Sequence, residues 1–130
     1  MKIVLDNIYK SYKKGSQEVP VLKGFSKVLN SNMMYLVKGP SGAGKTTLFR
    51  LLTTLLNPDS GYATIDGYDI NKDYLSIRSR VGYMPGRFSL YPDLSVEENL
   101  HFFAALFGVE VEDSYDLIAP IYKQIEPFRT

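Results

Sequence analysis

The stretch of sequence that decides the fold is Gly39-Pro40-Ser41-Gly42-Ala43-Gly44-Lys45-Thr46. It matches the pattern G-x-x-x-x-G-K-[ST], in which a glycine-rich loop joins a strand to a helix. An unbroken apolar run at 33–37 precedes this loop, and the leucines at positions 48, 51, 52 and 55 follow it at helical spacing. The flanks therefore predict a strand at 33–37, buried on both faces, and a helix at 45–55.

The residue types in this loop suit the binding of a phosphate group. Glycines at 42 and 44 let successive backbone amides point inward without Cβ clashes, and the helix that follows aims its free amides at the same anion. Lys45 can reach the β- and γ-phosphates, the Thr46 hydroxyl can bind Mg²⁺, and Thr47 can donate to the α-phosphate. The predicted phosphate-binding residues are Gly39, Pro40, Ser41, Gly42, Ala43, Gly44, Lys45, Thr46 and Thr47, with Thr46 also the metal ligand.

Composition excludes several other classes of protein. The chain has 130 residues, 45% of them apolar, which is enough for the core of one domain. There is no cysteine, and no run approaches the roughly 20 apolar residues of a transmembrane helix. Asp6 comes too early for a signal peptide. We therefore expect a cytoplasmic, soluble chain.

Charge is unevenly distributed along the chain, although the net charge is only +1. Residues 1–50 hold nine Lys/Arg against two Asp/Glu, whereas residues 51–130 hold six against twelve. The small net charge argues against bulk nucleic-acid binding. A basic front half suits a polyanionic ligand, and scattered surface lysines would give the same count.

The rest of the chain alternates between short strand and helix patterns. We expect strands at 1–5, 25–28, 62–65 and 81–84, with a tight turn at Asp66-Gly67. Ser95 and Glu98 form a capping box that opens a helix, and a last helix spans 114–125, bent by Pro120. The capped helix should bury one face, formed by Leu100, Phe103, Ala104 and Phe107. This alternation predicts an α/β fold.

Beyond the glycine loop, further segments resemble the nucleotide-binding domain of ABC transporters, in the order in which that family has them. They are Asn7-Ile8-Tyr9-Lys10-Ser11-Tyr12, Val21-Leu22-Lys23-Gly24, the hairpin at 58–67, the segment Arg80-Val81-Gly82-Tyr83-Met84-Pro85, and residues 90–100. The likeness covers almost the whole chain, and it is far more specific than the glycine loop alone.

This resemblance implies a fold, a ligand and partners. The fold would be an ABC-type P-loop NTPase, represented by an N-terminal antiparallel β-subdomain with the P-loop core (1–94) and the start of the helical subdomain (95–130). Tyr12 matches the aromatic that stacks on adenine in this family, so ATP and Mg²⁺ are the expected cofactors. The expected partners are a membrane-spanning transporter subunit and a second nucleotide-binding domain, on the inner face of the membrane, with no nucleic acid.

The sequence departs from the family pattern in two places. Gly86 stands where the family has a glutamine whose oxygen reaches the Mg²⁺ region, and glycine offers no ligand. The signature motif Leu-Ser-Gly-Gly and a strand followed by Asp-Glu are both absent, and His101 is interpreted as an ordinary helix residue. We therefore expect ATP binding without autonomous hydrolysis. We also expect residues 33–37 to expose apolar side chains and unpaired backbone, because strands from the absent half would flank them.

Two alternatives to an ABC-type ATPase remain from the sequence. One is another P-loop class, such as a GTPase, but Asn71-Lys72-Asp73-Tyr74 has the wrong spacing for the guanine motif Asn-Lys-x-Asp. The other is a non-catalytic nucleotide-binding or interaction module, which Gly86 and the missing motifs favour. ATP turnover separates this module from an enzyme.

Overall fold

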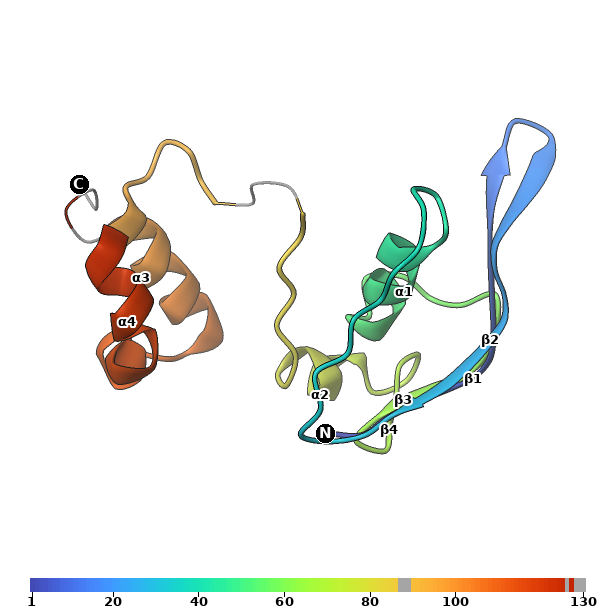
Figure 1. Ribbon diagram of the computed structural model, residues 1–130, viewed down its shortest axis with the longest axis horizontal. Coiled ribbons are helices and arrows are strands. Elements are labelled where there is room, and N and C mark those ends of the chain that lie inside the picture. The colour runs from blue at the N-terminus through green and yellow to red at the C-terminus, as the bar shows by residue number, and fades with distance from the viewer. Residues whose placement is uncertain (87–89, 126, 128–130) are drawn as a thin grey trace. The chain divides into compact units, whose positions relative to one another are not determined.

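The computed structural model describes residues 1–86, 90–125 and 127 (Figure 1). They form two compact units, Met1–Tyr83 and Met84–Thr130. The first unit holds the glycine loop and all the strands that are described, and the second holds the capped helix.

The first unit is built on a four-stranded antiparallel sheet with the order β2-β1-β3-β4. Its strands are β1 (Ile3–Lys14), β2 (Gln17–Leu29), β3 (Ser60–Ile65) and β4 (Tyr68–Asp69). β1 and β2 are far longer than the sequence predicted, because they continue past β3 as a two-stranded hairpin that turns at 15–16. Figure 1 shows the turn end of this hairpin projecting beyond the rest of the sheet, which explains its polar sequence.

A bulge in β1 controls how β1 pairs with β3. Asp6 pairs with Tyr62 and Tyr9 pairs with Ser60, so the register shifts between them. Within the bulge, Asn7 has a φ of 52°, and Gly61 of β3 crosses directly against it with a φ of 96°. A Cβ on Gly61 would lie 2.3 Å from the Asn7 carbonyl oxygen, so only glycine permits this crossing.

Two helices cover the core of the first unit. They are α1 (Lys45–Leu52), directly after the glycine loop, and α2 (Tyr74–Arg78), which the sequence did not predict. Leu51 and Ile77 are fully buried. The buried apolar cluster consists of Leu5, Ile8, Leu22, Leu48, Leu51, Ala63, Ile65, Ile70 and Ile77. Leucines at helical spacing therefore fix α1 on the sheet.

Two predicted strands are wrong. Residues 33–37 and 81–84 have no regular secondary structure, and α1 ends at Leu52 rather than at 55. A strand needs a neighbouring strand to pair its backbone groups. Among the described residues, none of the four strands of the sheet pairs with either segment. The expected exposure of 33–37 is confirmed, since Met34 is 97% exposed and Leu36 is 78% exposed. The interpretation that this run is buried on both faces is therefore wrong.

The second unit contains α3 (Val96–Phe107), a short 3₁₀ turn at Glu112–Ser114 and α4 (Tyr115–Ile125). The predicted capping box is confirmed, because the Ser95 hydroxyl accepts from the Glu98 amide and the Glu98 carboxylate accepts from the Ser95 amide. Asn99, which the sequence analysis did not identify, is buried and donates to the carbonyls of Tyr91, Leu94 and Ser95. It thus ties the preceding loop onto the helix.

The buried face predicted for α3 is only partly correct. Leu100, Phe103 and Ala104 are half-buried, whereas Phe107 is 62% exposed. Phe103 packs instead in an aromatic cluster with Phe102 and Tyr91, with ring centroids 4.9 to 6.3 Å apart. Within 1–86, 90–125 and 127, no helix has the length and apolar character needed to cross a membrane.

The exposed apolar run at 33–37 generates a prediction about association. Replacing Met34 and Leu36 with lysine should reduce self-association of the chain, because it removes the two most exposed apolar side chains of this run while leaving the buried cluster untouched. Light scattering on the two proteins at equal concentration tests this. A monomeric wild-type chain that unfolds cooperatively would show that the run does not drive association.

The capping box generates a prediction about pH. Hydrogen bonds from the Ser95 amide and hydroxyl lower the pKa of Glu98 below its usual 4.5. Because the pKa of Glu98 is lower in the folded chain than in the unfolded chain, the ionised carboxylate stabilises α3 at pH values above the unfolded pKa. This stabilisation is lost as the pH falls through the lowered pKa of the folded chain. The difference in unfolding temperature between the wild-type chain and Glu98→Ala should therefore shrink from neutral pH to about pH 3.

The control for this experiment is Glu98→Gln, because glutamine remains an acceptor in a capping box but does not titrate. The difference in unfolding temperature between Glu98→Gln and Glu98→Ala should therefore not change with pH. A wild-type advantage that does not change with pH would contradict the assignment.

Candidate functional site

The glycine loop leads directly into the first turn of α1. Gly44 occupies the N-cap position with a φ of 92°, and its carbonyl accepts from the Leu48 amide at 2.9 Å. Within the loop the Ala43 amide donates to the Pro40 carbonyl at 3.2 Å. No side chain caps α1. The amides of its first turn are therefore available to an anion, as the sequence predicted.

Gly44 also seats the loop on the sheet. A Cβ at this position would lie 3.0 Å from Val21 Cγ1 and 3.1 Å from Leu22 Cδ2, both on β2. Gly44 is buried by these contacts, and Leu48, one turn later, joins Leu22 in the core. Only glycine satisfies both the left-handed backbone and this close approach.

The loop surrounds a hollow of about 320 Å³. Its lining residues are Val21, Ser41, Gly42, Gly44, Lys45, Thr46 and Thr47. Lys45 extends back across the loop, where its Nζ donates to the carbonyls of Gly39 at 2.6 Å and Pro40 at 2.8 Å. An ammonium group carries three N–H donors, so these two bonds leave one donor for a bound anion.

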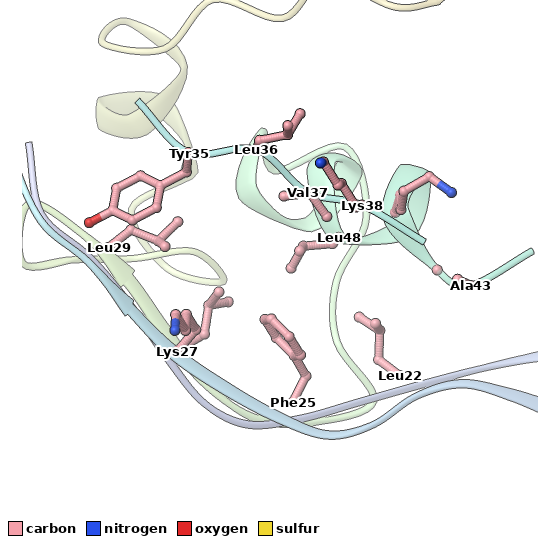
Figure 2. Close-up of a pocket in the computed structure, with 13 residues that line it drawn as sticks. Leu22, Phe25, Lys27, Leu29, Tyr35, Leu36, Val37, Lys38, Ala43 and Leu48 are labelled. Carbon is pink, nitrogen blue, oxygen red and sulfur yellow. The ribbon is translucent and has the colours of Figure 1, made fainter. Parts of the chain in front are cut away.

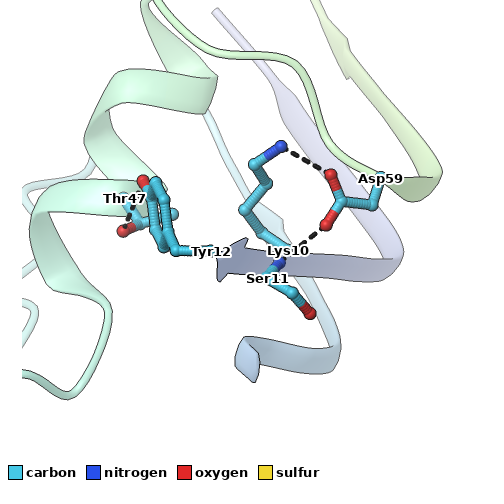
Figure 3. Close-up of polar contacts among 5 residues, drawn as sticks. All are labelled: Lys10, Ser11, Tyr12, Thr47 and Asp59. Atoms are coloured by element: carbon cyan, nitrogen blue, oxygen red, sulfur yellow. Dashed lines mark hydrogen bonds and ion pairs between the residues drawn. The ribbon is translucent and has the colours of Figure 1, made fainter. Parts of the chain in front are cut away.

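Tyr12 lies beside the start of α1, although 34 residues separate it from Thr46 in the sequence. Its hydroxyl shares a hydrogen bond of 3.3 Å with Thr47 Oγ1 (Figure 3). Thr47 is buried, whereas Tyr12 is 37% exposed. The structure thus brings the predicted aromatic and the predicted phosphate-binding loop together.

The carboxylate of Asp59, which was not predicted as a site residue from the sequence, contacts the two residues that precede Tyr12. Asp59 accepts from Lys10 Nζ at 2.5 Å with one oxygen and from the Ser11 amide at 2.6 Å with the other (Figure 3). The Lys10 ammonium, followed by the Ser11 amide, holds the pKa of Asp59 below its usual value. Asp59 is therefore an anion at neutral pH. The sequence showed Asp59 only as part of a hairpin, because its partners lie 48 and 49 residues away.

A second, more apolar hollow of about 400 Å³ lies between β2 and the segment that precedes the glycine loop (Figure 2). Leu22, Phe25 and Leu29 face it from β2, and Leu48 faces it from α1. Tyr35, Leu36 and Val37 line it from the other side, and of these Leu36 is the most exposed, at 78%. The segment 35–37 therefore has one apolar side toward the sheet and another that nothing in the first unit covers.

Thr46 is the predicted magnesium ligand. Its surroundings suit a magnesium ion that is coordinated mainly by nucleotide phosphates and water. The residue is exposed at the hollow, and the described residues contain no group of three or more His, Asp or Glu that could hold a metal ion. Mg²⁺ commonly binds through one or two protein oxygens together with phosphate oxygens and water. The residues present fit that mode and do not form an all-protein cage.

Gly86 and His101 belong to the second unit, Met84–Thr130. A Cβ on Gly86 would meet nothing within 4 Å, and its backbone is not in the left-handed region. The conformation therefore does not require glycine at this position, so a tight turn does not by itself explain the residue. His101 is an exposed residue of α3.

The chain is similar to known proteins in both sequence and structure. The family model for ABC transporters matches residues 22–127. The probable multidrug ABC transporter ATP-binding protein YbhF of Escherichia coli (strain K12) is 53% identical over 74 residues, covering 57% of this chain and 13% of the relative. The linearmycin resistance ATP-binding protein LnrL of Bacillus subtilis (strain 168) is 35% identical over 104 residues, covering 80% of this chain and 32% of the relative.

Solved structures give the same answer for the fold. The dimeric, post-hydrolysis ATP-binding cassette MJ0796 bound to ADP and Pi superposes with a TM-score of 0.73 at 25% identity, covering 98% of this chain and 60% of that chain. An ATP-binding subunit of an ABC transporter superposes with a TM-score of 0.82 at 24% identity, which shows the fold alone. The chain spans about a third or less of the length of the two curated relatives. It belongs to the ABC transporter family and has the fold of the N-terminal part of an ABC ATPase cassette.

Proposed function

We propose that this chain binds MgATP through the glycine loop, as the nucleotide-binding part of an ABC transporter whose ATP hydrolysis drives transport across a membrane. The observation that carries the proposal is the hollow at the start of α1, which Lys45 lines and beside which Tyr12 contacts Thr47. Phosphates would lie against the uncapped amides of α1 and the Lys45 ammonium. The predicted phosphate-binding residues keep the roles assigned from the sequence.

The two ends of the nucleotide would be bound by different chemistry. Tyr12 offers an aromatic face, against which adenine would stack without needing an exact hydrogen-bond match. Thr46 would contribute its hydroxyl to Mg²⁺, which neutralises charge on the phosphates when bound. In this proposal residues 1–94 supply the β-subdomain and P-loop core, and residues 95–130 begin the helical subdomain.

The proposed partners follow from the family. YbhF is named a probable multidrug ABC transporter ATP-binding protein, and the cassette MJ0796 was solved as a dimer. We infer that the complete protein pairs with a second nucleotide-binding domain and a membrane-spanning subunit, at the inner, cytoplasmic face of the membrane. Nothing in the charge balance favours a nucleic-acid partner.

A second candidate function is a module that binds nucleotide without hydrolysing it. Gly86 favours this alternative, because the position has room for a side chain and yet offers no oxygen to the metal or to an attacking water. Phosphoryl transfer depends on positioning and charge neutralisation, so missing groups are costly. Release of ADP during incubation with MgATP distinguishes the enzyme from the module.

The first test of the proposal is the variant Lys45→Ala. It removes the cation of the glycine loop that lines the hollow, so MgATP binding should be lost or nearly so. Isothermal titration of the wild-type chain and of the variant with MgATP measures the change, and circular dichroism confirms that both are folded. Unchanged affinity would show that the phosphates bind elsewhere.

The second test is the variant Tyr12→Ala. Loss of a base–aromatic stack should weaken MgATP binding by roughly 1–3 kcal/mol. A control variant, Tyr12→Phe, keeps the ring and loses only the hydroxyl that contacts Thr47, so it should bind nearly as well as the wild type. Equal losses in the two variants would assign the effect to the hydroxyl and contradict stacking.

A further inference from the structure

Tyr12 lies on the part of β1 that pairs with β2 but not with β3. β3 pairs with β1 only as far as Tyr9, which is opposite Ser60. Beyond that point β1 is paired only with β2, through Tyr12 opposite Val19 to the turn. A two-stranded ribbon is marginally stable by itself. The last anchor before Tyr12 therefore controls where its ring lies relative to α1.

Asp59 provides that anchor. Its amide donates to the Tyr9 carbonyl at 2.9 Å, so its backbone adds one more rung to the pairing of β1 with β3. Its carboxylate then accepts from the Ser11 amide, the residue directly before Tyr12, and from the Lys10 ammonium. The side chain thus extends the ladder past the end of β3, up to the residue that precedes the aromatic.

We propose that Asp59 is a positioning residue for the nucleotide base, which acts by clamping Lys10 and Ser11 so that the Tyr12 ring is held beside Thr47. This inference rests on the proposed function, since it names what supports the adenine end of that same site. Asp59 itself touches neither phosphate nor base in this scheme. Its loss should affect the base end of the ligand and leave the phosphate end unchanged.

The substitution Asp59→Asn breaks the clamp with minimal change of shape. The two carboxylate oxygens of Asp59 each accept from a different donor, whereas an amide has only one acceptor oxygen. Asparagine can therefore keep either Lys10 or Ser11, and must turn its NH₂ group toward the other.

A matched control lies at the other end of β1. Asp66 accepts from the Lys2 amide at 2.6 Å and lies 3.7 Å from the N-terminal ammonium, in both cases through its Oδ1 atom. Asparagine can preserve that single acceptor, and it tolerates the positive φ of 51° at this position. Asp66→Asn thus removes a similar surface carboxylate from the opposite end of β3, far along the chain from Tyr12.

The experiment compares two ligands by isothermal titration with the full chain: MgATP, which has both ends, and magnesium tripolyphosphate, which has only the phosphates. We expect Asp59→Asn to weaken MgATP more than about threefold, and no more than Tyr12→Ala does, with tripolyphosphate affinity unchanged within about twofold. Asp66→Asn should bind both ligands as the wild type does. In a Tyr12→Ala background, Asp59→Asn should cause no further loss of MgATP affinity.

Each other result overturns the inference in an identifiable way. Equal losses for both ligands would mean that Asp59 only stabilises the fold, and unchanged MgATP affinity would mean that the clamp is not needed. A wild-type chain that binds both ligands with equal affinity would remove the role of Tyr12 while leaving the phosphate site intact. A folded wild-type chain that binds neither ligand would overturn the proposed function, and the inference with it.

Discussion

The close packing of Gly44 against β2 is the constraint on which the candidate site depends. At this residue the chain must leave the glycine loop, start a helix and pass within van der Waals contact of Val21 and Leu22. Because Gly44 lacks a Cβ, the N-terminus of α1 can be pressed onto the sheet while its amides stay open toward the hollow. Leu48 continues the same contact into the core. The proposed phosphate-binding loop and the hydrophobic core thus share one point of attachment.

The second constraint is that β1 pairs with β2 along its whole length but with β3 only as far as Tyr9. The bulge at Asn7, made possible by Gly61, shifts the register so that β3 ends opposite Tyr9. Beyond that point β1 pairs only with β2, and this two-stranded part of the sheet places Tyr12 next to the start of α1. Without the bulge, continuing the pairing of Asp6 with Tyr62 would place Ser60 opposite Ile8 instead of Tyr9. The bulge therefore sets which residue of β1 lies at the end of the ladder shared with β3.

The sequence predicted those features whose cause is local. The glycine loop, the turn at Asp66-Gly67 and the capping box of Ser95 and Glu98 each depend on residues a few positions apart, and each is present in the structure. The predicted strands at 33–37 and 81–84 failed because periodicity shows only that a segment suits a strand. Whether it becomes one depends on a partner for its backbone groups, and that partner is not encoded in the segment itself.

The same argument explains why the candidate site was only half predictable. The phosphate end is a single contiguous loop followed by a helix, so its chemistry can be recognised directly from spacing. The proposed base end is assembled from Tyr12, Thr47, and the Lys10–Asp59 pair, which come from β1, α1 and the residue before β3. Resemblance to a family identified Tyr12, but it gave no information on what holds the ring in place. Such support becomes visible only when the register of β1 against β3 is known, because a one-residue shift would move Ser11 away from Asp59.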